Sequence, residues 1–175
     1  MRLEEELVGT FTWVDGHADI WPWFADARMF ASIVMELAAP FRADSISKVV
    51  GIEARAFLLA GAVARELQAG VVPIRKRGAI FPGPHVSVRT SPDYRGLRTD
   101  LLLQEGVLAE SDRVLLVDDW VETGSQASAA SKAIDGMGAS VVGMSVIVDG
   151  SEAALRSRLP PLHALIRAES LGPAH

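Results

Sequence analysis

Two adjacent carboxylates, Asp118 and Asp119, follow an apolar run and precede a turn that contains glycine. The run, Val114 to Val117, has the length and β-branching of a buried strand. Carboxylates there can accept hydrogen bonds from sugar hydroxyls or contact a hydrated divalent cation. Backbone N–H groups of a turn and of the first helical residues can bind a phosphate. This segment could therefore hold a ribose 5-phosphate, and its turn comprises Glu122, Thr123, Gly124, Ser125 and Gln126.

An ordinary alternative is that the two acids only end a parallel strand, where polar residues are common. The whole array of strand, Asp-Asp, Thr-Gly-Ser and helix is more specific, and it resembles the signature of type I phosphoribosyltransferases. The resemblance implies that Asp118 and Asp119 contact the ribose of phosphoribosyl pyrophosphate, and that residues 122–126 bind its 5-phosphate. Two residues depart from the pattern: Glu122 brings a negative charge close to the phosphate, and Gln126 replaces the usual Thr.

A second segment, Glu53-Ala54-Arg55, lies between an apolar strand and a helix. A cation at a helix start opposes the helix dipole, and an anionic ligand would explain its presence. The segment resembles the pyrophosphate loop of adenine phosphoribosyltransferases, which implies that Glu53, Ala54 and Arg55 bind the substrate. Ala56 replaces the glycine that usually follows the arginine.

Three cations, Arg75, Lys76 and Arg77, follow the next apolar run. Taken alone, they are typical of a solvated basic patch. Beside a phosphate site they are better explained as a clamp on pyrophosphate. The stretch resembles the same subfamily, which implies that Arg75 and Lys76 bind the substrate, although Ala79 replaces a frequent lysine.

The sequence Ser91-Pro92-Asp93-Tyr94 resembles the Ser-x-Glu-Tyr element of that subfamily's mobile catalytic loop. The resemblance implies that Asp93 lies near the reacting centre. The alternative for Asp93 is an ordinary turn residue after proline.

Near the N-terminus, His17-Ala18-Asp19-Ile20 resembles the Phe-Arg-Asp-Ile element of the adenine enzymes, with Ala18 in place of an arginine of the adenine pocket. Trp13, Trp21 and Trp23 crowd the same region. Large aromatic side chains usually belong to the core, yet one could stack on a flat heterocycle.

Composition limits the other functions. A formal net charge of −5 argues against general nucleic-acid binding. The absence of cysteine excludes disulfides and thiolate metal sites, and it fits a reducing compartment. No segment reaches the roughly 20 apolar residues that span a bilayer. We therefore expect a cytoplasmic protein with neither nucleic acid nor membrane as a partner.

Apolar patterns predict an α/β fold with a mainly parallel sheet flanked by helices. We expect a single domain over residues 1–175, with residues 1–45 contributing a small N-terminal hood that recognises the base. Residues 75–92 are prone to form a loop. Strands are expected at Ser47–Ile52, Val71–Ile74, Leu97–Leu103, Arg113–Val117, Val141–Val148 and Ala164–Arg167, and helices at 26–41, Ala56–Gln68, Ser125–Met137 and Ala153–Arg158.

The resemblance implies an enzyme that transfers phosphoribose from phosphoribosyl pyrophosphate to a nucleobase, a purine such as adenine, and releases pyrophosphate. Asp93, Asp118 and Asp119 would be catalytic, Mg²⁺ would be carried by the pyrophosphate and not by protein ligands, and the protein would be a homodimer. A non-catalytic binding or regulatory protein on the same fold is the main alternative, because Ala18, Ala56, Ala79 and Glu122 depart from the family. A phosphotransferase is disfavoured because the chain lacks Gly-x-x-x-x-Gly-Lys-Ser/Thr.

Overall fold

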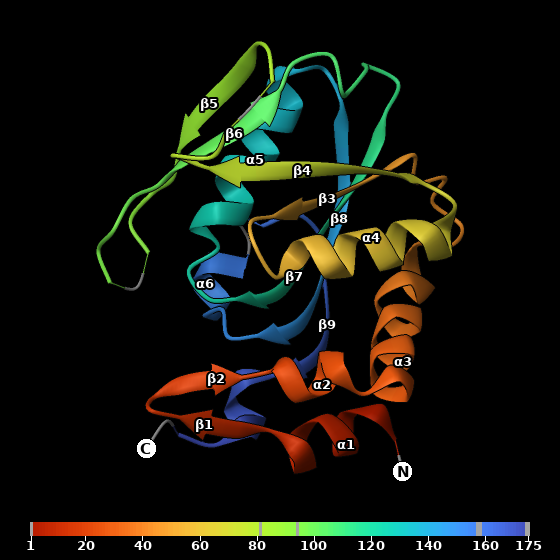
Figure 1. Ribbon diagram of the computed structural model, residues 1–175, viewed down its shortest axis with the longest axis vertical. Helices are drawn as coiled ribbons and strands as arrows, with labels where there is room; N and C mark the ends of the chain where they lie inside the picture. The colour runs from red at the N-terminus through yellow and green to blue at the C-terminus, as the bar shows by residue number, and fades with distance from the viewer. Residues whose placement is uncertain (1, 81, 94, 157–158, 174–175) are drawn as a thin grey trace.

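The computed structural model describes residues 2–80, 82–93, 95–156 and 159–173, and a seven-stranded sheet forms its centre (Figure 1). The strand order is β5-β6-β4-β3-β7-β8-β9. Five neighbouring strands run parallel, and two antiparallel strands extend one edge. The predicted α/β fold with a mainly parallel sheet is therefore confirmed. The parallel strands are β3 (Lys48–Ile52), β4 (Gly70–Lys76), β7 (Arg113–Val121), β8 (Ser140–Asp149) and β9 (Leu162–Arg167), and the edge strands are β5 (His85–Arg89) and β6 (Asp100–Gln104).

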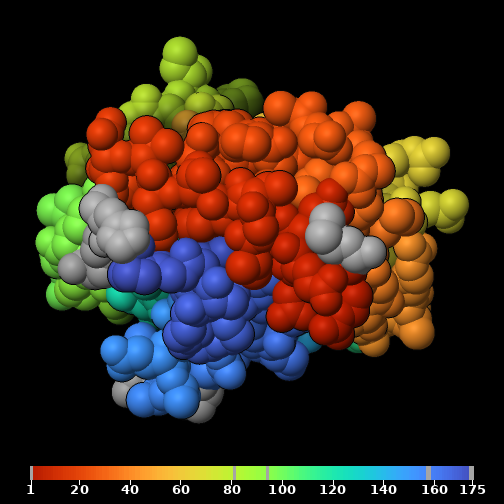
Figure 2. Space-filling model, turned by 90° about the horizontal axis from the view of Figure 1, so that it is seen from below, coloured from red at the N-terminus to blue at the C-terminus, as the bar shows by residue number. Residues whose placement is uncertain are grey.

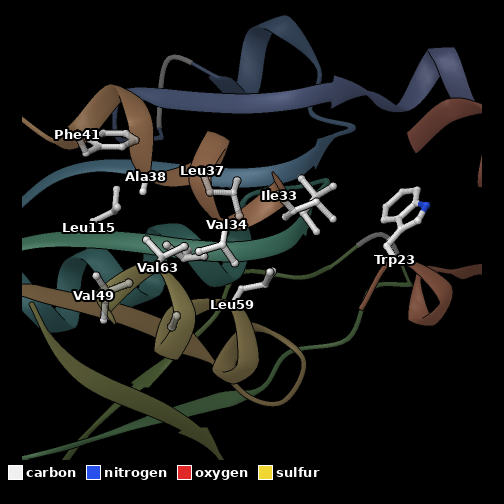
Figure 3. Packing of buried hydrophobic residues seen from close by; sticks show 14 of the residues in the cluster. Trp23, Ile33, Val34, Leu37, Ala38, Phe41, Val49, Leu59, Val63 and Leu115 are labelled. Atoms are coloured by element: carbon white, nitrogen blue, oxygen red, sulfur yellow. The ribbon is translucent and has the colours of Figure 1, made fainter. Parts of the chain in front are cut away.

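Helices cover both faces of the sheet. Successive side chains of a strand point to opposite faces, so Leu115 of β7 packs in one apolar cluster and Leu116 in the other. The first cluster, part of which is shown in Figure 3, includes Leu37 of α3 and Val63 of α4. The second includes Ile134 of α5. The helices are α3 (Ala27–Ala38), α4 (Ala56–Leu67) and α5 (Ser125–Gly136), with the short elements η1 (Ala39–Phe41) and α6 (Ala153–Arg156).

The start of α3 follows the sequence prediction closely. The carboxylate of Asp26 accepts a hydrogen bond from the Met29 N–H at 2.7 Å, which caps the helix. The helix then buries Ile33, Val34 and Leu37 at helical spacing. The helix predicted over residues 26–41 is therefore present as α3, and a short 3-10 turn, η1, follows it.

The N-terminal hood is a separate small layer at one end of the sheet (Figure 1). Its two strands pair only with each other, as an antiparallel hairpin. Figure 2 shows this segment in red beside the C-terminal segment in blue, and the indole of Trp13 donates a hydrogen bond to the Gly172 carbonyl at 3.3 Å. The chain's two ends thus form one layer, made of α1 (Leu3–Thr10), β1 (Thr12–Val14), β2 (His17–Asp19), α2 (Trp21–Ala25) and η2 (Ala168–Leu171).

Several boundaries differ from the sequence prediction. Helix α4 ends at Leu67, one residue before the predicted end, with Gln68 as a C-cap in a left-handed conformation with φ of 56°. Strand β4 begins at Gly70, one residue before the predicted start. Strand β4 continues to Lys76 because Arg75 and Lys76 pair with β6. The predicted loop 75–92 contains β5, an edge strand with alternating partly buried and exposed residues. Tyr94 and the predicted end of the last helix at residue 158 lie outside the described residues.

Within the described ranges, no helix combines the length and apolar character required to cross a membrane.

Candidate active site

The acid pair lies inside β7, not after it. The strand continues past the predicted end at Val117, because Trp120 and Val121 still pair with β8. Asp118 is partly exposed, whereas Asp119 retains only 6% of its surface. The Asp118 carboxylate accepts a hydrogen bond from the Asp119 N–H at 2.9 Å, so the two acids are locally tied together.

The turn between β7 and α5 requires glycine at its centre. Gly124 has φ of +66°, and a Cβ there would lie 2.5 Å from Leu159 Cδ2. The Thr123 hydroxyl donates to Ser125 Oγ at 3.0 Å and accepts from the Ser125 N–H at 3.4 Å. The turn therefore leads directly into α5. The first N–H groups of this helix have no partners within the helix, and they lie at the end of the turn.

A cavity of about 470 Å³ joins this turn to the hood. It contains Asp118 and all five residues 122–126 of the predicted phosphate loop. The predicted Asp93 and Arg55 also line it, but the buried Asp119 does not. The remaining lining residues are Trp13, Gly16, His17, Ala18, Arg95, Trp120, Val121, Ala127 and Met144.

Arg55 is the ion-pair partner of Asp119. The two side chains form an ion pair with 2.6 Å between Arg55 Nη2 and Asp119 Oδ2. The pair lacks hydrogen-bond geometry, so this buried oxygen accepts no hydrogen bond from any described residue. Arg55 immediately precedes α4, after a Glu53–Ala54 peptide bond that is cis. The predicted pyrophosphate loop and the acid pair are thus in direct contact.

Glu53 and Arg75 are already paired with each other. Glu53 Oε2 accepts hydrogen bonds from the Lys76 N–H at 2.8 Å and from Arg75 Nε at 3.1 Å. These two donors hold the pKa of Glu53 below its usual range. Glu53, Ala54 and Arg75 line neither this cavity nor the adjoining smaller one. The structure therefore does not present Arg75 as a free pyrophosphate clamp.

Lys76 faces the smaller cavity of about 270 Å³. That cavity shares Asp93, Arg95, Ser125 and Gln126 with the first. The two cavities therefore adjoin at Ser125 and Gln126, the first residues of α5, and Lys76 lines only the smaller one.

Asp93 caps its own loop. Its Oδ1 accepts hydrogen bonds from the backbone N–H groups of Arg95, at 2.8 Å, and Leu97, at 2.9 Å. Its Oδ2 faces the Arg95 guanidinium at 3.2 Å. The backbone donors, with Leu97 first, and Arg95 lower the pKa of Asp93. This is the turn role given as the alternative; the catalytic role stays a prediction for a residue that lines both cavities.

The two other acids at the cavity are less readily ionised. Burial of the Asp118 carboxyl, together with the charge of Asp119, raises its pKa well above the usual range. Glu122 is exposed at the cavity wall, and desolvation and the charge of Asp93 raise its pKa. Desolvation and repulsion between like charges therefore raise the pKa values of both Asp118 and Glu122, and shifted pKa values are common at functional sites.

Aromatic residues form the wall nearest the hood. Trp13 and Trp120 line the cavity with ring centroids 6.1 Å apart. Trp23 is core, with only 1% of its surface exposed, and Trp21 lies 53% exposed without lining the cavity. Sequence reasoning missed Trp120, Val121 and Met144. The first two follow the acids in β7, and the apolar Trp-Val pair was the available signal that the strand continues.

Residues 24–164 match the family model of the phosphoribosyl transferase domain. The chain belongs to this family. It is 41% identical over 155 residues to the adenine phosphoribosyltransferase of Bradyrhizobium sp. strain BTAi1, covering 86% of this chain and 85% of the relative. It is 36% identical over 149 residues to that of Rhizobium meliloti, covering 85% and 81%. The predicted family resemblance is confirmed, and the phosphotransferase alternative is set aside.

Solved structures agree with this assignment. The adenine phosphoribosyltransferase of Rhodothermus marinus superimposes with a TM-score of 0.84 at 30% identity, covering 94% of this chain and 98% of that one. The enzyme from Saccharomyces cerevisiae, complexed with an imino-altritol bisphosphate and adenine, gives 0.80 at 25% identity, covering 93% and 98%. The sheet and its flanking helices are thus the fold of this family.

Proposed function

We propose that the protein transfers phosphoribose from phosphoribosyl pyrophosphate to adenine and releases pyrophosphate, a reaction of purine salvage. The observation that carries the proposal is the cavity that joins Asp118 and the turn 122–126 to the hood. Such a cavity can hold a phosphate, a sugar and a base in one line. The names of the relatives and the adenine in the yeast structure support adenine as the base.

The phosphate and the ribose would bind at the carboxyl end of β7. Backbone N–H groups of the turn and of the first residues of α5 would hold the 5-phosphate. Asp118 and Asp119 would accept hydrogen bonds from the ribose hydroxyls. Asp119 Oδ2 accepts no hydrogen bond from any described residue, so it is available for such a bond. Breaking the bond at C1 leaves positive charge on the sugar, which these carboxylates would stabilise.

The leaving pyrophosphate carries the opposite charge. Arg55 of the first cavity and Lys76 of the second would bind it, and Arg95 and Arg98 are further cations that line these cavities. Glu53 and Arg75 would contribute to pyrophosphate binding only through Lys76, since Glu53 accepts a hydrogen bond from the Lys76 N–H and pairs with Arg75. We assign these two residues to positioning Lys76, and we keep Asp93 as a candidate beside the reacting centre.

Mg²⁺ fits this arrangement as an ion carried by the pyrophosphate. Bound there, it would neutralise part of the leaving group's charge. The adjacent carboxylates Asp118 and Asp119 are suitable contacts for its water shell. No protein cage is required for that role.

The hood would recognise the base, with residues 1–45 acting as part of a single domain over 1–175. His17 and Ala18 of β2 line the cavity beside Trp13. Ala18 removes the arginine of the family's adenine pocket, so the indoles are the main surfaces left for stacking.

Assembly and location follow from the family. We propose a homodimer, which light scattering on the purified protein would test. We also propose a cytoplasmic location, where the substrates of nucleotide salvage are found.

The base is tested by incubating the protein with phosphoribosyl pyrophosphate, Mg²⁺ and adenine, hypoxanthine, guanine, xanthine, uracil or orotate in turn. The proposal predicts formation of the nucleotide from adenine above all others. Binding of phosphoribosyl pyrophosphate without turnover on any base would favour the non-catalytic binding protein, which the departures at Ala18 and Glu122 motivate.

A further inference from the structure

Glu122 stands at an unexpected place for an acid. It directly precedes Thr123 in the turn between β7 and α5, and it lines the cavity beside the proposed phosphate site. No hydrogen bond or ion pair joins its carboxylate to another described residue. Its carboxylate therefore lies at the cavity wall without a partner among the described residues.

The other charged groups around the cavity leave Glu122 uncompensated. Arg55, before α4, is paired with Asp119 of β7. Arg95, in the loop before β6, is paired with Asp93 of the same loop. The remaining titratable lining residues are Asp118 of β7 and His17 of the hood. Lys76 of β4 and Arg98, which precedes β6, line the adjoining cavity.

We propose that Glu122 weakens binding of the dianionic 5-phosphate, so that phosphoribosyl ligands bind more tightly as the pH falls. The inference rests on the proposed function, because it places that phosphate at residues 123–126. A carboxylate beside a phosphate repels it. Protonation removes the repulsion and turns the carboxylate into a hydrogen-bond donor.

The direction of the pH effect follows from the surroundings. Desolvation at the cavity wall and the charge of Asp93 raise the pKa of Glu122 from its ordinary value of 4.5, so protonation begins at a higher pH than for a free glutamate. A phosphate monoester also loses its second charge below about pH 6. Both changes reduce the repulsion in the same direction.

The test compares the affinity of ribose 5-phosphate for wild type and Glu122→Gln by calorimetry at roughly pH 8 and pH 5.5, which lie on either side of the phosphate's second pKa. Ribose 5-phosphate isolates the phosphate site from the base. Glu36→Gln is the matched control, since Glu36 is exposed on α3 and does not line either cavity. It makes the same change in net charge away from the site.

We expect Glu122→Gln to bind about five-fold more tightly than wild type at the higher pH, as one weakly screened charge pair would give. The advantage should be smaller at the lower pH, because protonation of the carboxylate and that of the phosphate both reduce the repulsion. Glu36→Gln should match wild type at both. His17, Asp93 and Asp118 are present in all three proteins, so the ratio of affinities isolates Glu122.

Equal affinities of wild type and Glu122→Gln at both pH values, or weaker binding by the variant, would overturn the inference while leaving the phosphate site intact. Failure of all three proteins to bind ribose 5-phosphate or phosphoribosyl pyrophosphate would instead overturn the proposed function, and this inference with it.

Discussion

Arg55 Nη2 and Asp119 Oδ2 lie 2.6 Å apart, and this contact ties the turn before α4 to the central strand β7. Asp119 is 6% exposed and does not line the cavity, whereas Arg55 does. If both residues contact the same substrate, the pair has to open when the substrate binds. Arg55 would then turn to the pyrophosphate and leave Asp119 free for the ribose.

Replacing Arg55 tests both roles of this pair. Arg55→Ala should raise KM for phosphoribosyl pyrophosphate about ten-fold, because one charged contact is lost. It should also lower the free energy of unfolding by about 1–2 kcal/mol, since Asp119 keeps a buried charge without its cation. Steady-state kinetics and urea unfolding give the two values.

Asp119→Asn and the double variant complete a double-mutant cycle for this contact. The two stability changes should not add, because the neutral amide introduced by Asp119→Asn no longer needs a cation. Arg77→Ala is a suitable control, because its side chain is 77% exposed and its pair with Asp100 lies at the sheet edge. Additive changes at Arg55 and Asp119 would show that their contact contributes nothing to stability.

Asp118 should lower the stability of the folded protein at neutral pH. Its folded-state pKa is raised, so the folded protein disfavours the ionised form, and this penalty is present above that pKa and vanishes below the unfolded value near 3.8. Asp118→Asn should therefore raise the melting temperature by about 2–4 °C at neutral pH, the shift of roughly 1 kcal/mol. The gain should shrink as the pH falls toward 4; a gain independent of pH would contradict this account. Thermal unfolding across that range measures it.

Asp149 should behave in the opposite way, although it ends the neighbouring strand β8. Its carboxylate accepts hydrogen bonds from the Ser151 N–H at 2.8 Å and from Arg156 and Arg167, each at 2.5 Å. Asp149→Asn should lower the free energy of unfolding by about 2 kcal/mol, because the buried carboxylate loses its charge-assisted hydrogen bonds to Arg156 and Arg167. Chemical unfolding at neutral pH checks this, and a neutral or stabilising result would be inconsistent with a fully satisfied acid.

Gly124 should control the phosphate turn. Gly124→Ala forces a side chain into a left-handed conformation and against Leu159, which should cost about 1–2 kcal/mol and raise KM for phosphoribosyl pyrophosphate. The same substitution at Gly136, in α5, meets no atom within 4 Å and should be neutral or stabilising. Equal effects at the two glycines would argue against a special turn at Gly124.

The sheet, its helices and the phosphate turn could be predicted because their residues carry local signals. The continuous apolar runs of β3, β7 and β8 and the cap at Asp26 depend on residues that are neighbours in the sequence. Strand β5 was missed because it is stabilised by pairing with β6, a contact between segments that lie apart in the chain. Its flanking glycine and prolines give the opposite local signal.

The partners of the charged residues could not be predicted in the same way. Residue type and spacing placed Arg75 and Arg55 near pyrophosphate, but only the fold shows that Glu53 holds Arg75 and that Asp119 holds Arg55. The hood was expected, yet its hairpin and its contact with Gly172 depend on the far end of the chain. Trp120 likewise enters the site because β7 is longer than its apolar run.

Adenine-dependent release of pyrophosphate from phosphoribosyl pyrophosphate, measured for wild type and for the Asp118→Asn, Asp119→Asn double variant, tests the central claim most directly. We predict turnover by wild type and a loss of at least about 100-fold in kcat for the variant, the scale expected when stabilisation of a developing charge is removed. Circular dichroism should show the variant folded. Unchanged turnover in a folded variant, or no adenine-dependent release by wild type, would contradict the account.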